Sequence, residues 1–102
     1  MSTGAAGNDV LDVLELRGRA HVRSLHERWA RQRLAGDPAW EETVDAFAQA
    51  RVYQALLVGH VDFARRPCRP QDDAAIQRGH VEFALAVLRL LAGLEWHPHR
   101  VD

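Results

Sequence analysis

Apolar side chains recur along this 102-residue chain at intervals of three and four, the spacing that places residues on one face of an α-helix. The first such segment starts at Asn8 or Asp9, either of which can cap a helix, and Gly36 ends it just after Leu34. Its apolar stripe consists of Leu11, Leu14, Gly18, Val22, Leu25 and Trp29. We therefore expect a first helix over about residues 9–34.

A second helix is expected from about residue 38. Asp37 can cap it, and Pro38 occupies a position where a missing N–H costs nothing. Pro67 and Pro70 prevent the helix from continuing, so residues 67–71 are expected to form a turn. The apolar stripe of this helix consists of Trp40, Val44, Phe47, Val52, Leu56, Gly59 or His60, and Phe63.

The third segment has the most regular pattern in the chain. Asp72 or Asp73 can cap it, and Gly93 with the residues that follow is expected to end it. Its stripe follows the spacing 4, 3, 4, 3, 4 and consists of Ile76, His80, Phe83, Val87, Leu90 and Leu94.

These patterns predict an all-α protein, because no alternating strand pattern bounded by hairpin turns occurs in the chain. Three long helices with short connections should pack as antiparallel neighbours in an up-down-up bundle. We expect a disordered N-terminal tail over residues 1–8, a single helical domain over 9–95 and a C-terminal tail over 96–102.

The second and third helices have more apolar residues than one stripe requires. Residues 55–61 contain only His60 as a polar group, and residues 83–94 contain only Arg89 as a charged one. Such helices are usually buried on more than one side, which predicts a homodimer that completes a larger helical bundle, or an accessory subunit of a hetero-complex. A tightly folded monomer that exposes alanines is the alternative. The expected contact residues are Leu56, Phe63, Phe83, Val87, Leu90, Leu91 and Leu94.

A near-repeat, GHVDFA at 59–64 and GHVEFA at 79–84, flanks the expected turn. If the chain folds back there, His60 and His80 lie at similar heights, and Glu15 of the first helix comes to the same level. Two imidazoles and one carboxylate suit zinc or ferrous iron, and two histidines can also bind haem iron. The alternative is that both histidines are hydrogen-bonded core residues.

The first helix is locally basic, and its candidate phosphate-binding residues are Arg17, Arg19, Arg23, Arg28 and Arg31. The segment LDVLELRGRAHVRSLHERWA resembles the first two helices of winged-helix DNA-binding domains, with Arg17 and Gly18 as the turn between them. The resemblance implies DNA binding but covers about twenty residues, and the recognition helix and β-wing that should follow are missing. Arginines that complement the helix dipole explain the same residues without a ligand.

Composition narrows these hypotheses. The net charge of −1 argues against general binding of polyanions, and the single cysteine, Cys68, excludes an intramolecular disulfide. The first nine residues lack a secretory signal, and each apolar stretch is too short to cross a bilayer, so we expect a cytoplasmic protein with no membrane partner.

No catalytic motif indicates an enzyme. We therefore expect a small helical interaction or assembly protein, with a metal- or haem-binding bundle and a nucleic-acid-binding regulator as the alternatives.

Overall fold

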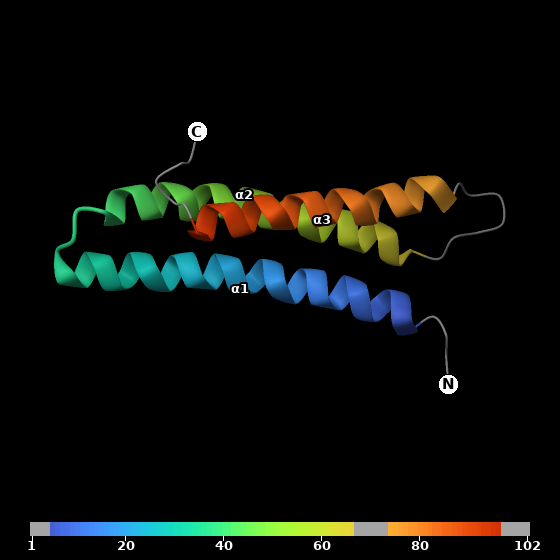
Figure 1. Ribbon diagram of the computed structural model, residues 1–102, viewed down its shortest axis with the longest axis horizontal. Coiled ribbons are helices and arrows are strands. Elements are labelled where there is room, and N and C mark those ends of the chain that lie inside the picture. Colours follow the sequence, from blue (N-terminus) through green and yellow to red (C-terminus); the bar gives the residue numbers. More distant parts are fainter. Residues whose placement is uncertain (1–4, 67–73, 97–102) are drawn as a thin grey trace.

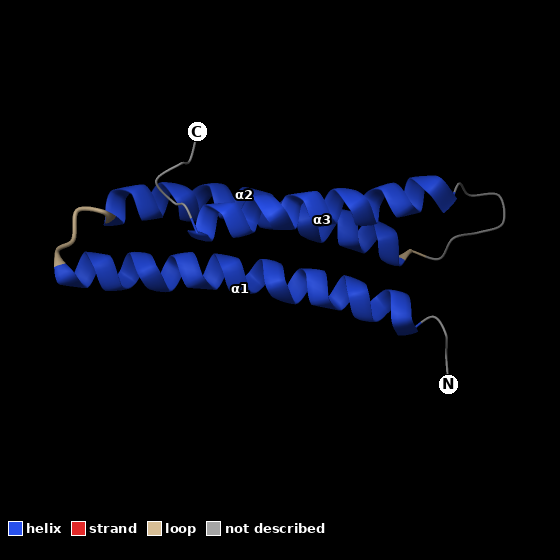
Figure 2. Cartoon of the chain, in the orientation of Figure 1, coloured by secondary structure: helices blue, strands red, loops and turns tan. Residues whose placement is uncertain are grey.

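The computed structural model describes residues 5–66 and 74–96, with side chains for residues 10–66 and 74–96. Within these ranges the chain forms three helices, α1 (Ala5–Ala35), α2 (Trp40–Arg65) and α3 (Ala74–Trp96), and Figure 2 shows no strand. The helices run up, down and up, and all three pack against one another (Figure 1). The expected all-α fold with three helices is confirmed.

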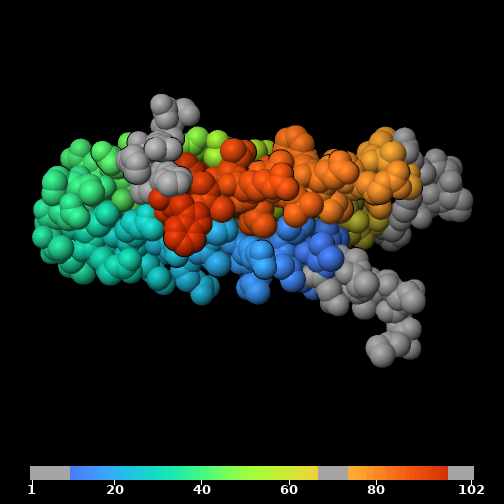
Figure 3. Space-filling model, viewed as in Figure 1, coloured from blue at the N-terminus to red at the C-terminus, as the bar shows by residue number. Residues whose placement is uncertain are grey.

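The bundle is long and thin. Its radius of gyration is 16.4 Å, whereas a compact chain of this length has about 13 Å. Figure 3 shows α1 and α3 side by side along one face of the molecule. An elongated bundle of three helices has a small interior volume relative to its surface area, so many apolar side chains remain at the surface.

The turn between α1 and α2 follows the sequence signals closely. Gly36 has φ 69°, a left-handed conformation that glycine adopts without strain. Its N–H donates to the carbonyl of Arg33, and the N–H of Asp37 donates to the carbonyl of Gln32 at 2.9 Å, which together form a Schellman motif. Asp37 Oδ1 accepts the N–H of Ala39 at 3.0 Å in this turn, but Asp37 is not the N-cap of α2, which begins at Trp40 after the N-cap residue Ala39.

Two helix ends differ from expectation, and the end of α2 agrees with it. α1 begins at Ala5, so Asn8 and Asp9 lie inside the helix and do not start it. α3 continues through Gly93 to Trp96, because one glycine costs a helix only about 1 kcal/mol. α2 ends at Arg65, where Arg66 turns extended (ψ 139°) as a residue before a proline prefers. The expected turn at 67–71 and the caps Asp72 and Asp73 lie outside the described residues.

The predicted stripe of α1 is confirmed. Leu11, Leu14, Gly18, Val22 and Leu25 are buried, and Trp29 is half-buried. The other sides of α1 are not uniformly polar, since Val10, Val13 and Leu16 are exposed, but the predicted stripe is the side that packs against α2 and α3.

The predicted stripes of α2 and α3 are largely wrong. Relative to the prediction, each helix is rotated about its own axis by about one residue position. The residues that α2 buries are Thr43, Ala46, Ala50, Leu57 and Val61. The residues that α3 buries are Ala84, Val87, Leu91 and Leu94, of which only Val87 and Leu94 were on the predicted stripe. The large residues that the pattern assigned to the core and that remain exposed are Val52, Leu56, Phe63, Ile76, Phe83 and Leu90.

Small residues at the helix contacts explain this rotation. A Cβ built on Gly18 of α1 would lie 2.4 Å from Leu57 Cδ2, so any larger residue at this position would require the Leu57 side chain or the helices to shift. Ala46, Ala50 and Ala84 are fully buried and take the place of larger side chains between the helices. Because interaxial distance depends on the size of the side chains at the contact, these residues allow tight packing while the large ones point outward.

Substitution of Gly18 by alanine is expected to destabilise the fold. Alanine would gain about 1 kcal/mol of helix propensity, but the added methyl group overlaps the fully buried Leu57, and overpacking a core costs about 1–3 kcal/mol. We expect a net loss of about 1 kcal/mol in the free energy of unfolding, measured by urea titration. Gly93→Ala is the control, since a Cβ there meets no atom within 4 Å and should stabilise the protein slightly. Equal gains from both substitutions would contradict the close approach at Gly18.

Candidate functional site

The near-repeat folds as expected around one pair of histidines. The Nδ1 atoms of His60 on α2 and His80 on α3 lie 2.9 Å apart, a hydrogen-bond distance. Both side chains are half-buried. The hairpin therefore brings the two imidazoles to the same height, and one ring donates its Nδ1 proton to the other.

Each histidine also packs on the phenylalanine of the other repeat. The His60 ring lies 4.3 Å from the Phe83 ring, and the His80 ring lies 4.1 Å from the Phe63 ring, measured between centroids. The hexapeptides thus form a reciprocal cluster, in which residues of one repeat contact the equivalent residues of the other. We call His60, Phe63, His80 and Phe83 the His–Phe cluster.

The hydrogen bond limits how many protons the cluster can hold. When both imidazoles are neutral, or when one is charged, one Nδ1 donates and the other accepts. When both are charged, both Nδ1 atoms are donors and the bond is lost. The cluster can therefore share a single proton between two rings.

The third expected metal ligand is directed elsewhere. Glu15 accepts a hydrogen bond from Arg65 of α2, and Asp12 accepts a second one. The hydrogen bond with Glu15 is the largest cause that raises the pKa of Arg65 above its ordinary value. The expected set of His60, His80 and Glu15 is not assembled.

The geometry of α2 explains why. Arg65 follows His60 by five residues, which places the two side chains about 140° apart around the helix. Arg65 faces α1, whereas His60 faces α3, so a carboxylate on α1 meets the arginine and not the histidines. Within residues 10–66 and 74–96, no three His, Cys, Asp or Glu side chains lie close enough together to hold a metal ion.

The seven expected contact residues divide into two groups. Val87, Leu91 and Leu94 are buried in the chain's own core, which removes them from a contact surface. Leu56, Phe63, Phe83 and Leu90 are exposed and line one side of the bundle together with other exposed residues of α2 and α3. We call this surface the outer face and define it as Val52, Leu56, Gly59, Phe63, Ile76, Gly79, Phe83, Ala86 and Leu90.

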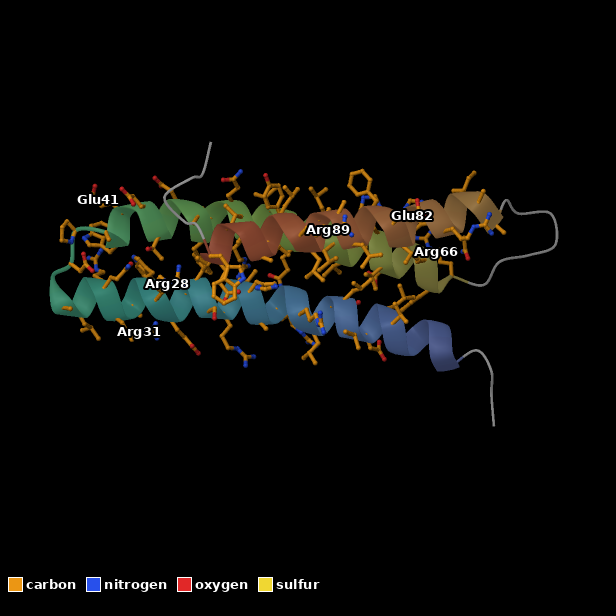
Figure 4. All side chains as sticks on the ribbon, viewed as in Figure 1. Arg28, Arg31, Glu41, Arg66, Glu82 and Arg89 are labelled. Atoms are coloured by element: carbon orange, nitrogen blue, oxygen red, sulfur yellow. The ribbon has the colours of Figure 1, made fainter. Side chains whose placement is uncertain are left out.

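The five expected phosphate-binding arginines do not form one surface. Figure 4 shows Arg31 on the side of α1 turned away from the other helices and Arg28 on the side turned toward them. Arg28 donates to the main-chain carbonyl of Glu95 at 2.7 Å, and Arg17 lines the hollow between α1 and α3. Arg19 and Arg23 line a different groove, between α1 and α2. The arginines therefore lie on several sides of α1 and do not form a continuous track for a nucleic-acid backbone.

Two features of the structure were not predicted from the sequence. Nδ1 of His21 on α1 forms a hydrogen bond with the carboxylate of Glu95 on α3, which ties the end of α3 to the middle of α1. Arg51 of α2 joins Arg19 and Arg23 in their groove. Arg51 had a visible signal, because it is the only charged residue in the apolar stretch 46–61. The His21–Glu95 contact had none, since these residues are 74 positions apart in the chain.

Comparison of the chain with known protein families, with curated proteins and with solved structures gives no match. In the part of the chain that the structure describes, none of the helices is long and apolar enough to cross a lipid bilayer.

Replacement of the histidines by phenylalanine tests the hydrogen bond in the His–Phe cluster. His60→Phe or His80→Phe alone leaves the remaining imidazole without its partner, and each should cost about 1–2 kcal/mol of unfolding free energy. The double variant should cost less than the sum, because removing both partners leaves no unpaired group. Additive effects at pH 8, measured by urea titration, would show that no bond couples the rings.

Proposed function

We propose that the protein is an association module that forms a homodimer through the outer face of α2 and α3. The observation that carries this proposal is the continuous exposure of large apolar side chains along that face. Phe83 is 52% exposed, Leu90 is 51% exposed and Val52 is 60% exposed. Contiguous exposed apolar patches of more than a few hundred Å² are uncommon on monomeric proteins. Burial of this face by a second copy would remove their apolar surface from water.

The size of the outer face matches what a stable dimer requires. The 23 residues of α3 span about 35 Å, and two packed helices present a width of roughly 20 Å. The face therefore offers about 700 Å², close to the roughly 800 Å² that each partner buries in a standard interface. The apolar hollow between α1 and α3 is a shorter surface, lined by Val10, Val13, Leu14, Arg17, Leu85 and Leu88.

The shape of the face favours a second copy over an unrelated partner. Ile76, Phe83 and Leu90 recur every seven residues along α3, and the small residues Gly79 and Ala86 lie between them. A Cβ built on Gly59 or Gly79 meets no atom within 4 Å, so these positions are open notches. A face that has both large side chains and notches can pack on its own copy by two-fold symmetry, with knobs of one chain in the notches of the other.

Charged groups lie beside this face, and the guanidinium of Arg66 also covers the Phe63 ring, 4.7 Å from its centroid. Asp62 and Arg66 of α2, and Glu82 and Arg89 of α3, place both signs of charge near it; Figure 4 labels the last three. A copy related by two-fold symmetry therefore meets charges of both signs around an apolar centre, which is the usual anatomy of an interface.

The His–Phe cluster adds a chemical property to this interface. Phe63 and Phe83 belong to both the cluster and the outer face. A change in the positions of the histidine rings would therefore move side chains of the contact surface. Loss of the hydrogen bond between His60 and His80 would allow the rings to separate. The proposed interface should therefore depend on the pairing of the two rings.

A charge placed in the outer face should dissociate the dimer without unfolding the chain. Leu90→Glu would bury an unpaired carboxylate in the interface and should weaken association at least about 100-fold. Leu16→Glu on α1 is the matched control, because Leu16 is 60% exposed and lies outside the outer face. Sedimentation equilibrium should give a dimer for the wild-type chain and the control, and a monomer for Leu90→Glu. A wild-type chain that stays monomeric at about 100 μM, or equal dissociation of both variants, would contradict the proposal.

Gly79→Ala should act in opposite directions on folding and on association. The added methyl group meets no atom of its own chain, so higher helix propensity should stabilise the monomer by up to about 1 kcal/mol. The same methyl group would fill a notch and should weaken the dimer about tenfold. Urea titration in a Leu90→Glu background isolates the first effect, and sedimentation of the single variant measures the second. A dimer that Gly79→Ala leaves unchanged would show that Gly79 lies outside the contact.

A further inference from the structure

A groove between α1 and α2 gathers cationic and aromatic side chains that none of the contacts described above uses. Its volume is about 490 Å³, within the range of small-molecule sites. The lining residues are Arg19, Val22, Arg23, His26, Trp29, Phe47, Arg51 and Gln54. No acidic residue is among them.

Three of these side chains are guanidinium groups without a partner. Among the described residues, Arg19, Arg23 and Arg51 form no ion pair and no hydrogen bond. By contrast, Arg28, Arg33, Arg65 and Arg66 each contact a carboxylate, a carbonyl or an aromatic ring. Three like charges that converge on one groove repel one another, and an anion bound between them would remove that repulsion.

The other lining residues form an aromatic wall. The His26 ring lies 5.6 Å from the Trp29 ring and 5.4 Å from the Phe47 ring, between centroids. The indole N–H of Trp29 is shielded from solvent and has no acceptor in the described structure. A planar ring can pack against these aromatic side chains, and Gln54 adds an amide that can donate to or accept from it.

We propose that this groove binds a small phosphorylated ligand that carries a planar ring, of the chemical class of a nucleoside diphosphate. Guanidinium groups bind phosphate oxygens in pairs, and three of them match the charge of two phosphate groups. The ring of the ligand packs against the aromatic side chains of the groove. Arg19 and Arg23 come from α1 and Arg51 from α2, so the site exists only when the two helices are packed together.

This site is separate from the proposed dimer interface. On α2, Arg51 faces α1, whereas Leu56 and Phe63 belong to the opposite, outer side. The inference therefore does not rest on the proposed function. The Leu90→Glu variant, which should be a monomer, is expected to keep the site intact.

Calorimetric titration of the full chain at low salt tests the proposal with three probes: pyrophosphate, ADP and adenosine. ADP should bind at one site per chain and more tightly than pyrophosphate, because its base contacts Trp29. Adenosine, which lacks phosphate, should not bind measurably. Binding should weaken as salt is added, because the contacts are ionic.

Two arginine variants decide whether the groove is the site. Arg51→Ala should weaken ADP binding at least about tenfold, because it removes a charge-assisted hydrogen bond. Arg31→Ala is the control, since this arginine points away from α2 (Figure 4) and does not line the groove. Equal weakening by both variants, or no binding of ADP and pyrophosphate, would overturn the proposal. Binding of a single-stranded oligonucleotide alone would also overturn it and assign the arginines to nucleic acid.

Discussion

The close approach of the helices at small residues is the constraint on which the rest of the structure depends. Gly18 leaves room for Leu57, and Ala46, Ala50 and Ala84 fill the remaining contacts without bulk. Because these positions must face inward, the rotation of α2 and α3 about their own axes is fixed. That rotation turns Phe63, Phe83 and Leu90 toward the surface, and it places Arg51 beside the arginines of α1.

The two proposed surfaces follow from this rotation in different ways. The outer face is apolar because α2 and α3 have more large apolar residues than one chain's interior can contain, which favours association with a second copy. The groove between α1 and α2 is cationic because Arg19, Arg23 and Arg51 converge there without acidic neighbours. The His–Phe cluster lies at the edge of the outer face and links its shape to the hydrogen bond between two histidines.

The sequence predicted features that depend on local signals and missed those that depend on packing. The helices, the turn at Gly36 and the inward stripe of α1 could be predicted, because glycine, proline and the spacing of apolar residues mark them directly. The pairing of His60 with His80 could be predicted because a hairpin fixes relative height. The rotation of α2 and α3 could not, since both are apolar nearly all round and alanine contributes little to a hydrophobic pattern. Glu15 was misassigned because height alone does not show which side of α2 it faces.

Fluorine NMR of the chain labelled with fluorophenylalanine tests the central claim most directly, because two of the three phenylalanines lie in the outer face and the third lies outside it. Phe63 and Phe83 belong to the outer face, whereas Phe47 lies partly buried between α1 and α2. On dilution from dimer to monomer, the resonances of Phe63 and Phe83 should shift together and become sensitive to solvent, while that of Phe47 stays constant. If Phe63 and Phe83 do not respond to concentration, or if Phe47 responds as they do, the outer face is not where the chains meet.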